Sequence, residues 1–163
     1  MESSTQQHPT FGFSEKSFVE YKKFAFYFYS HIDNVNPIVL NKTAINKFLA
    51  AYAELDKRVS QEKLCIQQDL NINATLIEAG KQPFDPIDKE FYKETLTTYK
   101  VWKICLQANK YQNNIYVWLK LFAQSKEDPL LYVPCKGGVI LPHDNFADLK
   151  NFITNCTNPQ KWK

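Results

Sequence analysis

The segment NNIYVWLKLFAQ, residues 113–124, combines aromatic rings with a lysine in a regular alternation. Read at a period of two, one face carries Ile115, Val117, Leu119, Leu121 and Ala123, and the other carries Tyr116, Trp118, Lys120, Phe122 and Gln124. The first face suits a buried core, whereas the second would meet water in a half-buried strand. Because rings stack on nucleobases and lysines contact phosphates, the pattern predicts a surface for single-stranded nucleic acid.

Further rings and cations extend this predicted surface. The additional candidates are Lys100, Trp102, Lys103, Lys110 and Lys136, and in the first half of the chain Lys23, Tyr27 and Tyr29. Arg58 is the only arginine, so nearly all of the positive charge is lysine. Lysine lacks the bidentate fork of arginine, which favours phosphate contact over the reading of base edges. We therefore expect binding with little sequence preference, to either DNA or RNA.

A protein interface is the main alternative use of the same residues. Exposed aromatic patches mark partner surfaces as readily as ligand surfaces. Helices or a second subunit could also cover both faces of these strands. In that case Trp118 would anchor an interface, and the chain would be an interaction or oligomerisation module.

The sequence does not predict an enzyme. His8, His31 and His143 lie far apart, and the carboxylates of FDPIDKE, residues 84–90, suit a solvated loop. The sequence contains no glycine-rich phosphate loop, nucleophile elbow or HExxH motif. We expect no cofactor and no metal site.

Composition limits the class of protein. The 163 residues allow one domain or two small ones, and a net charge of +3 does not by itself identify a polyanionic partner. The four cysteines form no CxxC pair, and no apolar leader opens the chain, so we expect reduced thiols in a nuclear or cytoplasmic protein that is not secreted. No apolar run is long enough to cross a bilayer, which predicts no membrane contact.

In the first half, the pattern predicts a tail, a strand and a long helix. Residues 1–14 are polar and turn-rich, which indicates a flexible tail. Aromatic alternation predicts a strand over residues 23–29. A helix capped by Asn41 or Thr43 is expected to continue weakly through Leu64. After Gly80, two prolines predict a loop.

In the second half, the pattern predicts four strands followed by a helix. The expected strands are residues 97–107, 113–124, 130–136 and 139–141, and the helix covers residues 142–155. Pro134 marks an edge or a bulge of the third strand. The predicted fold is therefore α+β, with a curved antiparallel sheet and helices on one side.

A weak internal repeat relates the two halves. IVLNKTAINKFL, residues 38–49, aligns with VILPHDNFADLK, residues 139–150, and each has an aliphatic triplet, a polar cap and a helix. Residues 15–96 could thus be a degenerate copy of the unit at residues 97–155, with residues 156–163 as a tail. Chance similarity between two strand-to-helix corners is the alternative.

The segment KGGVILPHDNFADLKNFI, residues 136–153, and the aromatic strand before it resemble a known family. Over about residues 97–155, the chain is similar to the single-stranded-DNA-binding domain of the transcriptional coactivator positive cofactor four and to the plant Whirly proteins. Lys136 with the Gly137–Gly138 bend matches the family's lysine-glycine turn, Phe146 matches the aromatic that opens the helix, and Trp118 and Lys120 fall on the strand that would meet DNA. The family's strands are usually richer in basic residues, and SKEDP, residues 125–129, adds acid here.

This resemblance implies a curved four-stranded antiparallel sheet, a helix that dimerises, and nucleic acid bound on the sheet. It implies a homodimer that binds single-stranded nucleic acid in replication, transcription or genome packaging. Heavy use of lysine and asparagine with little arginine is typical of AT-rich genomes, including viral ones.

Overall fold

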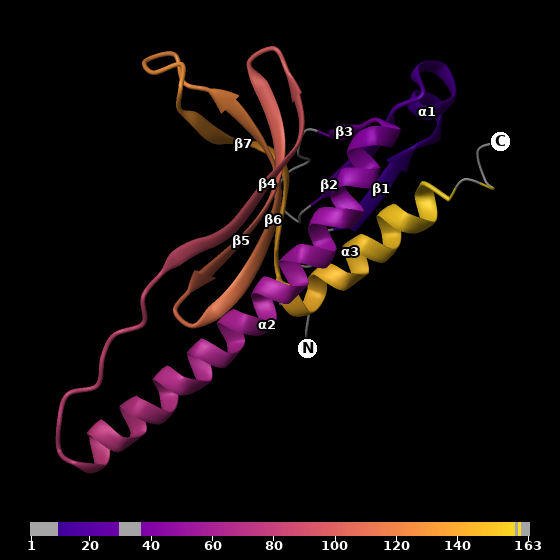
Figure 1. The fold of residues 1–163 in the computed structure, drawn as a ribbon. Helices are drawn as coiled ribbons and strands as arrows, with labels where there is room; N and C mark the ends of the chain where they lie inside the picture. The colour runs from indigo at the N-terminus through magenta and orange to yellow at the C-terminus, as the bar shows by residue number, and fades with distance from the viewer. Residues whose placement is uncertain (1–9, 30–36, 159, 161–163) are drawn as a thin grey trace, which may run out of the picture.

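The computed structural model describes residues 10–29, 37–158 and 160 (Figure 1). The elements in this part of the chain are β1 (Thr10–Ser14), α1 (Glu15–Tyr21), β2 (Phe24–Tyr29), β3 (Ile38–Leu40), α2 (Lys42–Glu78), β4 (Lys89–Tyr99), β5 (Trp102–Tyr111), β6 (Asn114–Gln124), β7 (Tyr132–Pro142) and α3 (His143–Cys156). The predicted α+β class is confirmed. None of these helices is long and apolar enough to cross a bilayer.

The strands form two antiparallel sheets. Sheet A has the order β1-β2-β3, and sheet B has the order β4-β5-β6-β7, so strands that follow one another in sequence are neighbours in both. The two long helices pack against each other, with the rings of Tyr52 and Phe146 stacked at 5.7 Å. Nε2 of His143, at the start of α3, lies 2.9 Å from Oδ1 of Asp56 on α2 and fixes that contact.

Phenylalanine side chains fill the core beside sheet A. The predicted alternation of β2 buries Phe24, Phe26 and Phe28 on one face. Phe26 meets Phe152 of α3 at 6.1 Å, and Phe48 of α2 is fully buried in the same cluster. Complete burial of a phenylalanine contributes roughly 1.5–3 kcal/mol. These contacts hold sheet A against both helices.

One face of sheet B packs against α2 and α3. On β6, the predicted inward residues Ile115, Val117 and Leu119 are buried. Leu119 pairs with Leu106 of β5, and Val117 pairs with Leu141 of β7, so the apolar side chains continue across the sheet. The alternation of β6 therefore assigns this face correctly.

The bend predicted at Gly137 and Gly138 is, in the structure, a bulge within one strand. Between the pairs Lys120–Gly138 and Phe122–Pro134, residues 135–137 of β7 stand opposite a single residue of β6. Gly138 has a φ of +114° and lies so close to β6 that a Cβ atom would overlap the carbonyl oxygen of Leu119. Only glycine fits there, and the two strands predicted at 130–136 and 139–141 merge into β7.

Helix α2 runs well past the folded body (Figure 1). Its N-cap is Asn41, whose Oδ1 accepts a hydrogen bond from the Ala44 amide at 2.8 Å. The helix has 37 residues and so extends roughly 55 Å. The chain then returns beside it, held where the Asn73 side chain bonds both the N–H (2.9 Å) and the C=O (3.0 Å) of Phe84. We call residues 64–88 the arm.

Several elements differ from the prediction. Residues 10–14, assigned to a tail, form β1, and residues 1–9 lie outside the described part of the chain. The stretch predicted as one strand over 97–107 contains a hairpin turn, with Lys100 at a φ of 54° between β4 and β5. Strand β4 begins at Lys89, at the end of the predicted loop, and includes residues 91–96, to which no element was assigned. Helix α2 ends at Glu78, well beyond Leu64.

Strand β4 forms an irregular edge of sheet B. Its pairing with β5 shifts register between Glu90 and Tyr92 and again between Thr95 and Thr97. Each shift inserts an extra residue, and the second extra residue, Leu96, is buried in the core. The two bulges interrupt the row of free backbone groups along this edge.

Candidate nucleic-acid interface

The face of sheet B turned away from α2 and α3 is here called the open face. The pairing of the strands places its side chains in four rows across the sheet. From β4 to β7 these rows are Glu90, Asn109, Tyr116 and Pro142; Lys93, Gln107, Trp118 and Ile140; Thr95, Cys105, Lys120 and Gly138; and Thr98, Lys103, Phe122 and Pro134. All four predicted outward residues of β6 from Tyr116 to Phe122 lie on this face.

The rings on the open face are covered to different degrees. Tyr116 and Trp118 are half-buried, and Ile140 beside Trp118 is 45% exposed. Phe122 is only 3% exposed, and the Lys93 ammonium lies 4.4 Å from its ring centroid. Two rings are therefore accessible for stacking, and the third lies beneath a flexible cation.

Lysines surround these rings. The Lys103 ammonium lies 4.2 Å from the ring centroid of Tyr132, at the start of β7. Lys120 is half-buried, and burial lowers its pKa, an effect that Cys135 opposes. Lys136 is exposed on the bulge of β7. Cation–π contacts of this kind hold lysines over rings without neutralising their charge.

A hollow of about 430 Å³ opens at one end of the open face. Asn109, Tyr116, Trp118 and Ile140 contribute to its lining from three neighbouring strands, and Glu90 contributes from β4. Gln107, which pairs with Trp118, donates a hydrogen bond from Nε2 to Oδ1 of Asn109 at 2.9 Å. Asp88, Lys89, Lys110 and Tyr111 complete the lining, so this end of the face is polar and carries charges of both signs.

Some predicted binding residues do not lie on the open face. Lys110 points toward α2, is 6% exposed and lies 3.9 Å from Oε1 of Glu62, so it is a paired cation, although it lines the same hollow as Trp118. Trp102 pairs with Ala123 and belongs to the opposite face, at the tip of the β4–β5 hairpin, where Lys100 occupies the turn. Trp102 therefore lies on the other side of the sheet from Trp118.

The candidates from the first half belong to or adjoin sheet A. Lys23 is exposed just before β2, and Tyr27 is half-buried on that strand. The side chain of Tyr29 lies outside the described part of the structure. Lys23 and Lys103 both line a cavity of about 490 Å³ between β3 and the β4–β5 hairpin. Lys23 is therefore the first-half candidate that the described structure brings to a cavity shared with a second-half candidate.

Sequence reasoning missed several residues of the open face. Lys93 was overlooked because residues 91–96 were assigned to no strand, and Ile140 because its short strand was given no outward face. Asn109 and Gln107 were overlooked because the residues around them were assigned to a turn or a strand end. Alternation on β5 relative to Leu106 would have placed Gln107 outward, next to the rings.

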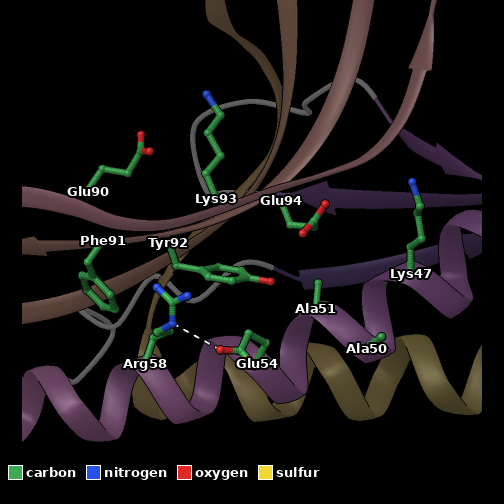
Figure 2. Close-up of a pocket in the computed structure, with 10 residues that line it drawn as sticks. All are labelled: Lys47, Ala50, Ala51, Glu54, Arg58, Glu90, Phe91, Tyr92, Lys93 and Glu94. Carbon is green, nitrogen blue, oxygen red and sulfur yellow. Dashed lines mark hydrogen bonds and ion pairs between the residues drawn. The ribbon is translucent and has the colours of Figure 1, made fainter.

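A second cavity, of about 770 Å³, lies between α2 and the β4 edge (Figure 2). Arg58 forms a 3.2 Å ion pair with Glu54 and lies 5.9 Å from the ring centroid of Tyr92. Burial, with the carboxylates of Glu94 and Glu54 nearby, raises the pKa of Tyr92, and Arg58 opposes this effect. The charges of the lining largely cancel one another.

Figure 2 also separates the two faces of β4. Tyr92 and Glu94 point toward α2, while Glu90 and Lys93 point to the other side of the strand. The last two side chains belong to the open face, as the strand pairing requires. Glu90 lines both the cavity beside α2 and the hollow on the open face, so the two adjoin at this residue.

Among the described residues, no three histidine, cysteine or acidic side chains group closely enough to hold a metal ion. All four cysteines are free thiols, and Cys105 and Cys156 are buried. No protein family, curated protein or solved structure matches this chain.

Proposed function

We propose that the protein binds single-stranded nucleic acid on the open face of sheet B, with little overall sequence preference. The observation that carries this proposal is the pairing of accessible rings with lysines on a sheet face that neither long helix covers (Figure 1). Replication, transcription and genome packaging are the processes that would use such a protein.

Stacking would supply the sequence-tolerant part of the affinity. Tyr116 and Trp118 are neighbours two residues apart on one strand, so successive bases could stack along β6. Each base–ring contact is worth roughly 1–3 kcal/mol, and every base has a face to offer. Ile140 extends the apolar floor beside Trp118.

Lysines would bind the phosphates. Lys93, Lys103, Lys120 and Lys136 lie on or beside the open face, and removal of Lys93 from Phe122 would uncover a further ring. Four neutralised phosphates on a single strand predict a log–log slope of affinity against salt of about −3. The electrostatic attraction between a phosphate and a half-buried lysine is also stronger than the attraction between the same groups in bulk water.

The order of elements supports the finer fold proposal, a Whirly-like arrangement with a degenerate second copy. In both halves a strand leads directly into a helix, β3 into α2 and β7 into α3, at the two corners that the sequence aligns. The first half has three strands in its sheet where the second has four. We propose that β1–α2 is the degenerate copy.

Two tryptophans allow a matched test of the binding surface. Trp118→Ala should weaken binding of a labelled single-stranded oligonucleotide by about 5- to 150-fold, the equivalent of one lost stacking contact. Trp102→Ala removes the same side chain from the other face of the sheet and should leave affinity unchanged. Fluorescence anisotropy measures both. Equal losses in the two variants would refute the assignment of the site.

Lysine variants test the electrostatic part. Lys103→Gln should weaken binding and make the salt slope less steep by about 0.7, the share of one phosphate. Lys57→Gln, an exposed position on α2, changes net charge equally and should not alter the slope. If the wild-type protein binds no oligonucleotide even at low salt, the proposed function is wrong.

Oligomerisation is the second candidate function, and the arm favours it. Phe84 and Ile87 are 70% and 71% exposed, and Leu70 and Ile77 beside them on α2 are also exposed. Apolar side chains gathered on one projection commonly mark an interface. We propose a homodimer, and light scattering should show Phe84→Ser with Ile87→Ser reducing the mass. If instead Trp118→Ala alone reduces it, the open face is the interface.

A further inference from the structure

We propose that the hollow beside Glu90, at one end of the open face, receives one unstacked nucleobase and prefers bases that carry an exocyclic amino group. This inference rests on the proposed function and refines it, because it assigns one position along the bound strand a base preference. The other positions would remain sequence-tolerant. Four features of the hollow support this view.

The shape and walls of the hollow fit a flat aromatic ligand. Its volume of about 430 Å³ lies within the range of roughly 300–1,000 Å³ that is usual for small-molecule sites. Tyr116 and Trp118 supply rings on one strand, and Ile140 supplies an apolar contact from the next. A base that left the stack along β6 could lie against these side chains.

Hydrogen-bond acceptors are in excess at this end of the sheet. Oε1 of Gln107 is buried, in a side chain that is 5% exposed, and accepts no hydrogen bond from the described residues. The Nε2 of the same amide already donates a hydrogen bond to Oδ1 of Asn109. An unsatisfied buried acceptor costs roughly 1–3 kcal/mol, so a donor that reached it would recover that free energy.

Glu90 adds a second acceptor beside the amides. It pairs with Asn109 across β4 and β5, lines the hollow, and forms no ion pair within the described part of the chain. Cytosine N4, adenine N6 and guanine N2 amino groups are donors that a carboxylate accepts. Uracil and thymine present two carbonyl oxygens around a single N–H, and their lone pairs would oppose Glu90.

Charged side chains of both signs line the hollow, Lys89 and Lys110 beside Asp88 and Glu90. Both lysines already face a counter-charge, since their Nζ atoms lie 3.3 and 3.9 Å from the carboxylate oxygens of Glu62 on α2. Glu90 is the carboxylate that remains to accept a hydrogen bond from the amino group of a base.

Matched pyrimidine oligomers test this inference. Oligo-dC and oligo-dU of about twelve nucleotides have a length within the usual site size. At each base, oligo-dC carries an amino group where oligo-dU carries a carbonyl group. At one fixed salt concentration and slightly alkaline pH, fluorescence anisotropy should show oligo-dC bound about tenfold more tightly, the value of one good base contact. Equal affinity for both oligomers would overturn the inference and leave the proposed function intact. Failure of both to bind at low salt would overturn the proposed function itself.

A pair of glutamate variants locates the preference. Glu90→Gln should reduce the dC-to-dU affinity ratio toward one, whatever its effect on absolute affinity. Glu94→Gln makes the same change of charge on the same strand but on the face toward α2, so the ratio should stay at its wild-type value. A ratio unchanged by Glu90→Gln, or reduced equally by both variants, would show that the hollow does not read the base. Far-ultraviolet circular dichroism checks that both variants remain folded.

Discussion

Replacement of Glu62 by glutamine should destabilise the protein strongly, because it leaves a buried ammonium group unpaired. Lys110 is 6% exposed, and its Nζ lies 3.9 Å from Oε1 of Glu62, whose side chain is itself mostly buried. At an effective dielectric constant of about 20, this pair is worth about 4 kcal/mol, in line with the 3–5 kcal/mol cost of breaking buried pairs. Lys89, 3.3 Å from Oε2, is half-exposed and adds at most about 1 kcal/mol.

Urea denaturation and thermal melting measure this effect. A loss of 3–4 kcal/mol corresponds to a fall in Tm of roughly 6–16 °C for a chain of this size. Lys110→Met leaves Glu62 with Lys89 at 3.3 Å and should therefore cost less than Glu62→Gln, and it should rescue Glu62→Gln when the two are combined. Glu54→Gln breaks an exposed ion pair with Arg58 on the same helix and should cost less than about 0.5 kcal/mol.

Two outcomes would refute this reasoning about Glu62. A cost below 1 kcal/mol for Glu62→Gln would mean that solvent already screens the Lys110 ammonium. A double variant no more stable than Glu62→Gln alone would mean that the glutamate stabilises the fold by some route other than the lysine.

Three further predictions concern stability and local order. Gly138→Ala should cost about 3 kcal/mol or prevent folding, because its Cβ would overlap the Leu119 carbonyl oxygen at a φ of +114°, and thermal melting tests this. Burial, with the Asp56 carboxylate nearby, raises the pKa of Tyr52 from 10.0 to about 12, so the folded state holds its proton more tightly than the unfolded state. Stability should be complete below pH 10 and fall as pH rises toward 12, and Tyr52→Phe should remove this part of the fall in urea midpoints. Asn73→Ala should speed proteolysis of the returning segment of the arm, with a global stability change within about 1 kcal/mol.

The sequence predicts those elements whose periodicity is unbroken. The strict alternation from Ile115 to Leu119 identifies β6 and both of its faces, and the apolar stripe of α3 identifies that helix. In β4 the extra residue at each of the two bulges changes which face the later side chains occupy. Apolar and polar residues therefore do not alternate regularly along this strand. The turn at Lys100 carries no glycine or asparagine to signal it.

The candidate site was predicted in part for the same reason. Tyr116, Trp118, Lys120 and Phe122 lie on one face because β6 is regular. Lys110 was assigned to the ligand because its counter-charge, Glu62, lies far away in sequence on α2. Lys93 covers Phe122 from two strands away, a contact that depends on how the sheet folds and that no local pattern encodes.

The two register shifts of β4 have a consequence for assembly. A regular edge strand can pair with a strand of another chain and so seed fibrils. Strand β4 has two bulges, so its free backbone N–H and C=O groups do not form a continuous row for such pairing. Lateral growth of sheet B into a polymer should therefore be blocked at the β4 edge.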